Sequence, residues 1–398
     1  MRNNSSALRP REIVKSRENR AVDPSPLRGM GTMDHTIFLV VIILTLFGVM
    51  MVFSASYVIT GRSAQFNFDS FYYLRRHGVM AVIGFLVLMI SSNFNYHLLK
   101  KFALPMYLAS LVLLILAWAV GHESHGAARW IDIFGFRFQP SEVSKAALIF
   151  VMAKIVSGNR RILDKWPGFL FCCGIVGVMS VFVLLGNLST AIIIAIIGGG
   201  MIFVASPHML RFIVVGAAGV SGMLGYLYYQ AYLAEGMGFR GGRFRAWIDP
   251  FSDMQGFGFQ IVQSLYAIAS GGLFGLGIGQ SRQKTFLPEV HNDVIFSVIA
   301  EELGFVGSGI ILLLFGILIW RGLKIAMNAP DNFGALVAAG IVLMIASQVI
   351  INVAVVTNSI PNTGIPMPFI SYGGTALVIC MGLMGVLLNI SRQTKLKE

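Results

Sequence analysis

Long apolar runs, separated by segments that carry most of the polar residues, dominate the chain. Because a membrane-spanning helix needs roughly 20 predominantly apolar residues, we interpret ten of these runs as spans. Their residue ranges are 36–58, 78–93, 102–120, 141–153, 167–185, 190–205, 212–230, 294–320, 333–356 and 374–391. The pattern predicts an all-α polytopic membrane protein with about ten transmembrane helices and a large outer loop, residues 231–292, between spans 7 and 8.

Three parts follow from the same pattern. Residues 1–35 are basic and contain three prolines, which predicts a disordered cytoplasmic tail. Residues 36–391 form the ten-helix membrane domain, and residues 392–398 form a short C-terminal tail. The first apolar run and its long N-terminal flank exceed the length of a cleavable signal peptide.

The composition supports a membrane protein and excludes a large soluble enzyme. Apolar residues make up 56% of the chain and charged residues 12%, against roughly 25% charged in a soluble domain. The three cysteines lie inside apolar runs and are expected to be packing residues. The net charge of +12 comes mostly from the tail and from the loops between spans, so no nucleic-acid partner is predicted.

The distribution of lysine and arginine predicts the orientation, because cytoplasmic loops are enriched in both residues. With the N-terminus inside, the inner segments hold 19 basic residues and the outer segments 10, and Lys145 lies within a span. We therefore expect both termini to be cytoplasmic and residues 231–292 to face the exterior.

Charges at the ends of spans are the first candidates for chemistry, since a charge at the bilayer centre costs at least ~2.5 kcal/mol. Glu142 and Lys145 are three residues apart after Pro140, so they share one helix face. Two interpretations of Glu142 and Lys145 remain open: an ion pair that neutralises itself, or a contact to the substrate. Asp293 stands where the eighth span begins and is read either as a helix N-cap or as a carboxylate in a water-filled mouth.

The outer loop has its own organisation. The apolar stretch 261–269 and the glycines of 271–279 predict a short helix or re-entrant segment followed by a turn. The glycines lack the spacing of a nucleotide-binding loop. Glu289 and His291 are read as solvated loop groups or as substrate ligands. Glu301 lies about 12 Å along the span from Asp293 at 1.5 Å per residue, too far for a carboxylate dyad.

Taken together, several blocks resemble the SEDS family of peptidoglycan polymerases, which includes RodA, FtsW and SpoVE. The matching blocks extend over nearly the whole chain after the tail: residues 48–56, 126–131, 139–142, 245–250, 260–265, 281–293, 301–304 and 364–374. The tail and the 366–374 block are more similar to FtsW and SpoVE than to RodA. One departure is that Gly186, Asn187 and Ser189 stand where the family usually has Pro, Asp and Gly.

The resemblance implies a glycosyltransferase that polymerises lipid II at the outer face of the bacterial cytoplasmic membrane, for division or sporulation. It implies Asp293 as the general base, and substrate contacts at the residues Lys145, Glu142, Arg243, Arg245, Glu289, His291 and Ser371. A requirement for a divalent cation, Mg²⁺ or Mn²⁺, is left open, with Asp293 as the candidate ligand. No organic cofactor is expected. The implied partners are a class B penicillin-binding protein and other divisome or elongasome membrane proteins.

Two other functions compete with polymerisation. A lipid II flippase would also use ten spans with buried charges, but it needs a polar path through both leaflets. A scaffold that recruits a transpeptidase would tolerate the loss of Asp293. The charged residues gather at the predicted outer ends of the spans, which favours the enzyme.

Overall fold

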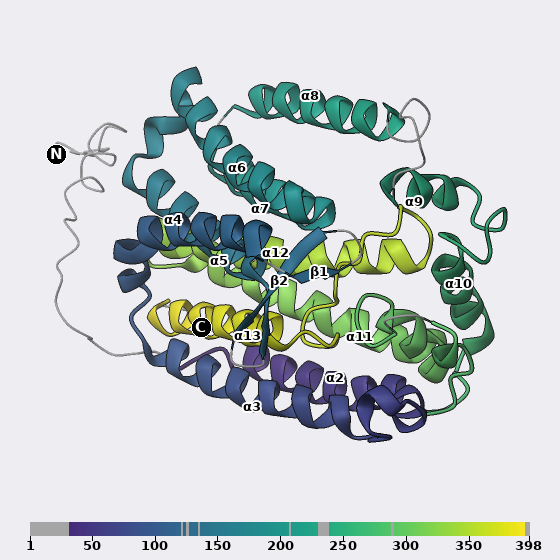
Figure 1. The fold of residues 1–398 in the computed structure, drawn as a ribbon. Coiled ribbons are helices and arrows are strands. Elements are labelled where there is room, and N and C mark those ends of the chain that lie inside the picture. Colours follow the sequence, from purple (N-terminus) through teal and green to yellow (C-terminus); the bar gives the residue numbers. More distant parts are fainter. Residues whose placement is uncertain are drawn as a thin grey trace, which may run out of the picture.

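The structure is a computed structural model that describes residues 32–120, 122–124, 127–133, 136–206, 208–229, 239–287 and 290–394. Ten long helices, shown in Figure 1, correspond to the ten predicted spans. Their bounds are α2 His35–Arg62, α3 Tyr72–Asn93, α4 His97–Val120, α5 Pro140–Gly158, α6 Trp166–Gly186, α7 Leu188–Ala205, α8 Met209–Tyr228, α11 Ile295–Asn328, α12 Asn332–Val356 and α13 Gly374–Gln393. The expected tail falls almost wholly on residues 1–31, outside the described residues.

The chain is a multi-pass membrane protein, as expected. Among the described residues, eight helices are long and apolar enough to cross a membrane. The remaining two long helices are α5, which carries Glu142, Lys145 and Lys154, and α8. The all-α polytopic architecture is thereby confirmed.

Two features outside the spans add detail to this architecture. A small antiparallel sheet, which the sequence did not predict, lies between α4 and α5 and consists of β1 His122–Ser124, β2 Ala127–Ile133 and β3 Phe136–Phe138. The outer loop contains α9 Phe239–Ile248, α10 Phe259–Gly271 and the 3₁₀ turn η4 Gln283–Thr285. The predicted short helix of this loop is therefore present as α10.

Helix α12 lies in the middle of the bundle, beside α5, α7, α11 and α13 (Figure 1). On another side, α13 packs tightly against α3 through small residues. A Cβ on Gly84 would lie 2.6 Å from the Met381 sulfur, and one on Gly385 would lie 2.0 Å from Ser91 Oγ. Ser91 Oγ also donates to the Gly382 carbonyl at 3.0 Å. Glycine therefore permits the close approach of these two helices, as is common in membranes.

Segments predicted to lie on the cytoplasmic side contact one another at one end of the bundle. Asp34, the N-cap of α2, accepts a hydrogen bond from the Ile37 amide and pairs with Arg321 at 2.7 Å. Tyr96 donates its hydroxyl to Asp331 at 3.0 Å, and its amide donates to Asn389 Oδ1 at 3.2 Å. These contacts join the predicted inner segments 1–35, 94–101 and 321–332 to the last turns of α13, so these three segments share one end of the bundle.

The segment that departs from the family pattern forms a helix cap. Asn187 is the N-cap of α7, and its Oδ1 accepts from the Ser189 amide at 3.0 Å and the Thr190 amide at 3.2 Å. Asparagine caps helices about as well as aspartate. The replacement therefore preserves a side-chain cap at the start of α7.

Candidate functional site

Asp293 lies in the turn that precedes α11, at the end of the bundle opposite the Asp34–Arg321 pair. Helix α11 begins at Ile295, and its N-cap is Val294, which makes no side-chain capping hydrogen bond. The N-cap interpretation of Asp293 is therefore wrong. The carboxylate is half-buried and belongs to an irregular segment that interacts with two other parts of the chain.

Three amide side chains hold Asp293 in place. Gln260 Nε2, in the first turn of α10, donates to Asp293 Oδ1 at 3.4 Å. Gln260 Oε1 in turn accepts from Asn362 Nδ2 at 2.7 Å. Asn352, buried in α12, donates to the backbone carbonyl of Asp293 at 2.7 Å and to that of Ile365 at 2.8 Å. The turn is thus tied to α10, to α12 and to the segment that follows α12.

Gly364 leaves room beside the second carboxylate oxygen. Its φ is +62°, in the left-handed region that favours glycine. A Cβ built on Gly364 would lie 3.4 Å from Asp293 Oδ2. Any other residue here would be strained and would occupy the space next to the carboxylate.

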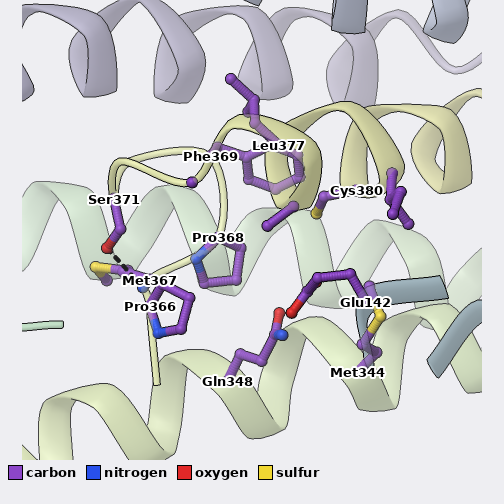
Figure 2. Close-up of a pocket in the computed structure, with 13 residues that line it drawn as sticks. Glu142, Met344, Gln348, Pro366, Met367, Pro368, Phe369, Ser371, Leu377 and Cys380 are labelled. Carbon is purple, nitrogen blue, oxygen red and sulfur yellow. Dashed lines mark hydrogen bonds between the residues drawn. The ribbon is translucent and has the colours of Figure 1, made fainter. Parts of the chain in front are cut away.

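Glu142 and Lys145 form the ion pair that their spacing predicts. Pro140 starts α5, and Lys145 Nζ lies 2.8 Å from Glu142 Oε1, with both side chains buried. Glu142 also lines a small cavity of about 20 Å³, room for roughly one water molecule. Figure 2 shows Glu142 and Gln348 of α12 pointing toward one another across this cavity.

Ser371 lines the same cavity, but its hydroxyl has a local partner. Ser371 Oγ accepts a hydrogen bond from the Met367 amide at 2.7 Å, drawn in Figure 2. This bond closes the turn of the segment 364–372, which runs from the neighbourhood of Asp293 to that of Glu142. The segment therefore links the two predicted groups of site residues.

His291 is packed among aromatic rings. Its ring centroid lies 4.1 Å from that of Tyr73 and 5.4 Å from that of Tyr372, and its carbonyl accepts from the Tyr372 amide at 2.8 Å. Burial, and secondly the nearby His77, lowers the pKa of His291 to about 4. The ring is therefore neutral at pH 7 and supplies no positive charge to a phosphate. It forms part of the wall of a second cavity of about 300 Å³ that also borders Ser56 and Phe286.

Arg243 and Arg245 lie on α9, which is fixed at the end of α12. Trp247 Nε1 donates to the Asn358 carbonyl at 3.1 Å, and Asn358 Nδ2 donates back to the Trp247 carbonyl at 3.3 Å. Arg243 is half-buried and Arg245 is exposed. The remaining predicted contact, Glu289, lies outside the described residues.

The sequence reading missed Gln260, Asn352 and Asn362 as site residues. Asn352 had a signal, because polar residues inside a span are rare and usually face the bundle interior. The partners of Gln260, Asp293 and Asn362, are 33 and 102 residues away in sequence, so no local pattern indicates the contacts. Within the described ranges, no group of three or more His, Cys, Asp or Glu side chains could hold a metal ion.

Glu301 and Glu302 prove to be fully buried structural anchors. Glu301 accepts hydrogen bonds from the Ser281 hydroxyl, from the Arg282 amide at 2.9 Å and from Ser270 Oγ at 3.3 Å. Glu302 accepts from Ser54 Oγ at 2.7 Å and pairs with Lys284 Nζ at 3.3 Å. Both carboxylates bind the chain between α10 and α11, and neither belongs to a dyad with Asp293.

The comparisons with known proteins extend over the same part of the chain. Residues 34–396 match the family described as cell cycle protein, that of FtsW, RodA and SpoVE. Stage V sporulation protein E of Bacillus subtilis is 40% identical over 91% of this chain and 98% of its own length. The probable peptidoglycan glycosyltransferase FtsW of Geobacter sp. strain M18 is 37% identical over 91% of this chain and 97% of its own length.

Solved structures agree with the sequence matches. One, described as "Structural coordination of polymerization and crosslinking by a peptidoglycan synthase complex", has a TM-score of 0.73 at 27% identity and covers 92% of this chain and 99% of that chain. The rod shape determining protein RodA of Thermus thermophilus has a TM-score of 0.67 at 26% identity, over 91% of this chain and 98% of that chain. With its family match across residues 34–396, the chain belongs to the FtsW, RodA and SpoVE family of cell cycle proteins.

Proposed function

We propose that this chain is a peptidoglycan glycosyltransferase that polymerises lipid II at the outer face of the bacterial cytoplasmic membrane, with Asp293 as its general base. Family membership and the printed names of the FtsW relatives support the activity. The observation that carries the assignment of the base is the half-buried carboxylate of Asp293, held through Oδ1 by Gln260 and flanked at Oδ2 by a glycine.

The chemistry needs one positioned base. The acceptor hydroxyl of one sugar attacks the anomeric carbon of the donor, and its proton passes to Asp293 as the new C–O bond forms. The bond between that carbon and the pyrophosphate oxygen breaks at the same time, with inversion, and the lipid pyrophosphate leaves as an anion. A direct displacement of this kind requires no covalent glycosyl-enzyme.

The leaving pyrophosphate needs positive charge. Lys145, which pairs with Glu142 at 2.8 Å, and Arg243 and Arg245 on α9 are the candidates for this role. Arginine binds phosphate oxygens through a planar fork of donors. Mg²⁺ or Mn²⁺ is a further proposal: Mg²⁺ is often held by one or two carboxylates together with substrate phosphates, a set that Asp293 and a pyrophosphate would supply.

The position of the buried charges supports an enzyme over a flippase. Among the described residues, Glu142, Lys145, Glu301 and Glu302 are buried toward the Asp293 end of their helices, and Lys284 is buried in the turn η4 of the outer loop. Asp34 is the buried acidic residue at the opposite end. A flippase would need a polar path across the inner halves of the spans as well.

The similar peptidoglycan synthase complex supports a partnership with a cross-linking enzyme. We propose that the partner is a class B penicillin-binding protein, within a larger set of divisome or elongasome membrane proteins. The 40% identity to the sporulation protein and 37% to FtsW favour a role in sporulation or division. We also propose that both termini face the cytoplasm.

Replacing Asp293 tests the base directly. Asp293→Asn keeps the side-chain shape and an oxygen that accepts from Gln260, but it cannot accept the acceptor's proton. Because general-base catalysis contributes about 10²- to 10⁴-fold, polymerisation of labelled lipid II by the purified chain should fall by that order. The matched control is Asp253→Asn, in the same loop, whose carboxylate caps the Phe257 amide at 2.9 Å, a bond that asparagine can also make.

The outcomes separate the candidate functions. Loss of synthesis in Asp293→Asn with normal folding and a normal Asp253→Asn supports the base. Partial recovery of synthesis at raised Mg²⁺ or Mn²⁺ would assign Asp293 to a metal instead. Normal glycan synthesis by well-folded Asp293→Asn would refute the assignment and favour the scaffold or the flippase, which lipid II translocation in vesicles would then distinguish.

A further inference from the structure

The glycine-rich turn, residues Gly271–Gly279, is joined to a break in α11. Gly304 has φ +69° and ψ −167°, which are not helical values. In an unbroken α-helix the carbonyls of residues 301 and 302 would accept from the amides of residues 305 and 306. The break leaves these four backbone groups without their helical partners.

The glycine-rich turn supplies all four missing partners. The Leu276 amide donates to the Glu301 carbonyl and the Gly277 amide to the Glu302 carbonyl, both at 2.9 Å. In return the Phe305 amide donates to the Gly272 carbonyl at 2.9 Å, and the Val306 amide donates to the Leu273 carbonyl at 3.0 Å. The backbone at the break is therefore satisfied by protein, as irregular backbone within a bilayer must be.

Glycine is required on both sides of this junction. A Cβ on Gly304 would lie 2.3 Å from the Gly275 amide nitrogen, and one on Gly275 would lie 2.2 Å from the Glu302 carbonyl oxygen. A Cβ on Gly271 would lie 2.0 Å from the Ala300 carbonyl oxygen. The two backbones approach too closely for any side chain between them.

The charges beneath the turn are paired or hydrogen-bonded locally. Lys284 Nζ contacts Glu302, donates to the Gly279 carbonyl at 2.7 Å and lies 4.7 Å from the centre of the Tyr57 ring. Glu301 is held by hydroxyl and amide donors from Ser270, Ser281 and Arg282. Such pairing is what a charged group needs in a low-dielectric environment.

The outward surface of the turn is apolar and exposed. Leu273 is 64% exposed, Phe274 79% and the adjoining Phe305 75%. Between Gly271 and Gly279 there is no charged residue. Farther along α11, Ile310 and Leu313 are also exposed, on a helix that crosses the membrane. The apolar surface of the turn is thus continuous with the lipid-facing surface of a span.

The position along α11 places the turn within the hydrocarbon. Trp320, with Arg321 and Lys324 just beyond it, marks the opposite interface, where aromatic and basic residues gather. Phe305 precedes Trp320 by 15 residues, about 22 Å at 1.5 Å per residue. The hydrocarbon core is about 30 Å thick, so Phe305 and the turn bonded to it lie inside its edge.

We propose that α10, the glycine-rich turn and η4, residues 259–287, form a re-entrant segment whose turn is seated among the lipid acyl chains of the leaflet nearer Asp293. Helix α10 begins beside Asp293, where Gln260 contacts the carboxylate, and ends at the level of Ala300, which it contacts closely. Figure 1 shows it beside the kinked end of α11. Insertion of the turn therefore anchors the helix that presents Gln260 to the candidate base.

Quenching of bimane fluorescence tests whether the turn lies among the lipid acyl chains. The full chain, with its three cysteines replaced by alanine, carries a single cysteine labelled with bimane and is reconstituted into phosphatidylcholine vesicles. The vesicles contain phospholipid with a nitroxide near the top of the acyl chain, or iodide is added to the water. The test site is Phe274→Cys, with Ser252→Cys as an exposed loop control and Ile310→Cys as a span control.

Bimane at position 274 should be quenched by the lipid nitroxide at least as strongly as at position 310 and several-fold more than at position 252. Iodide should quench position 252 more than positions 274 and 310. Iodide quenching at position 274 that equals that at position 252 would overturn the proposal. Protection from both quenchers would overturn it too, because the turn would then be covered by protein. Leu273→Cys gives the same readout independently, and since both side chains are largely exposed, neither change leaves a cavity.

Discussion

At the scale of single residues, two buried lysines of the described chain each lie beside a buried carboxylate. Lys145 lies 2.8 Å from Glu142, and Lys284 lies 3.3 Å from Glu302, with all four side chains buried. A buried charge without a partner is expensive, whereas a matched apolar replacement of a whole pair is often neutral. The pairs therefore differ from single charges in how they respond to substitution.

This difference gives a prediction for the Glu142–Lys145 pair. Lys145→Ala leaves Glu142 buried without its partner, so we expect a loss of about 3–5 kcal/mol in stability, together with lower lipid II polymerisation. The double change Glu142→Leu with Lys145→Met should restore the stability, because no buried charge remains. Thermal unfolding in detergent and the polymerisation rate measure the two effects separately.

The double variant decides what the pair does. Restored stability with absent synthesis would assign a substrate contact to the cavity that Glu142 lines. Restored stability with full synthesis would make the pair purely structural. A stable Lys145→Ala would contradict the burial argument itself.

Some contacts of the candidate site could be predicted from the sequence and others could not. The contact between Glu142 and Lys145 could be predicted from their spacing of three residues after Pro140, because residues three apart lie on the same face of a helix. Gln260 meets Asp293 only through the fold, since α10 must first pack against α11. Of the two alternatives for His291, a solvated loop group or a substrate ligand, the first is wrong, because the ring is buried against two tyrosine rings.

At the scale of elements, hydropathy located each long helix among the described residues but not the irregularities within these helices. Helix α3 begins at Tyr72 rather than at residue 78, because the hydropathy pattern stops at Arg75 and Arg76 while the helix does not. Helix α11 continues to Asn328, and Arg321 within it is paired with Asp34. The break at Gly304 has no signature in the sequence, since glycine is common in ordinary membrane helices.

The break at Gly304 predicts a position-specific cost for alanine. Gly304→Ala would place a side chain at φ +69° and 2.3 Å from the Gly275 nitrogen. Backbone strain of this kind costs of order 1–3 kcal/mol, and loss of the four junction hydrogen bonds adds to it. We expect a lower thermal midpoint and a smaller folded yield.

Gly309→Ala is the matched control for this prediction. It lies in the same helix, and a Cβ there would meet nothing within 4 Å. Alanine is the better helix former, so this change should leave stability equal or raise it by up to about 1 kcal/mol. Equal thermal midpoints for the two variants would show that the junction does not constrain α11.

At the scale of the whole molecule, polar contacts divide the bundle into two ends. One end joins Asp34 to Arg321 and Tyr96 to Asp331. The other joins Trp247 to Asn358 and the Asp293 turn to the segment after α12. The predicted spans group the loops in the same way, because consecutive spans must alternate in direction. The count of lysine and arginine then assigns one group to the inside. The grouping is thus a structural result, while the side that each end faces remains a prediction.

Cysteine labelling on intact cells tests that orientation. In a chain without native cysteines, Ser252→Cys should react with a membrane-impermeant maleimide from outside, and Lys395→Cys should react only after permeabilisation. The 19-to-10 excess of basic residues on the predicted inner segments is the physical reason. Because the contacts at each end tie several loops together, a reversed result at both sites would invert the whole bundle and leave its fold intact. Reaction of both sites from the same side would contradict the odd number of spans between them, which are α11, α12 and α13.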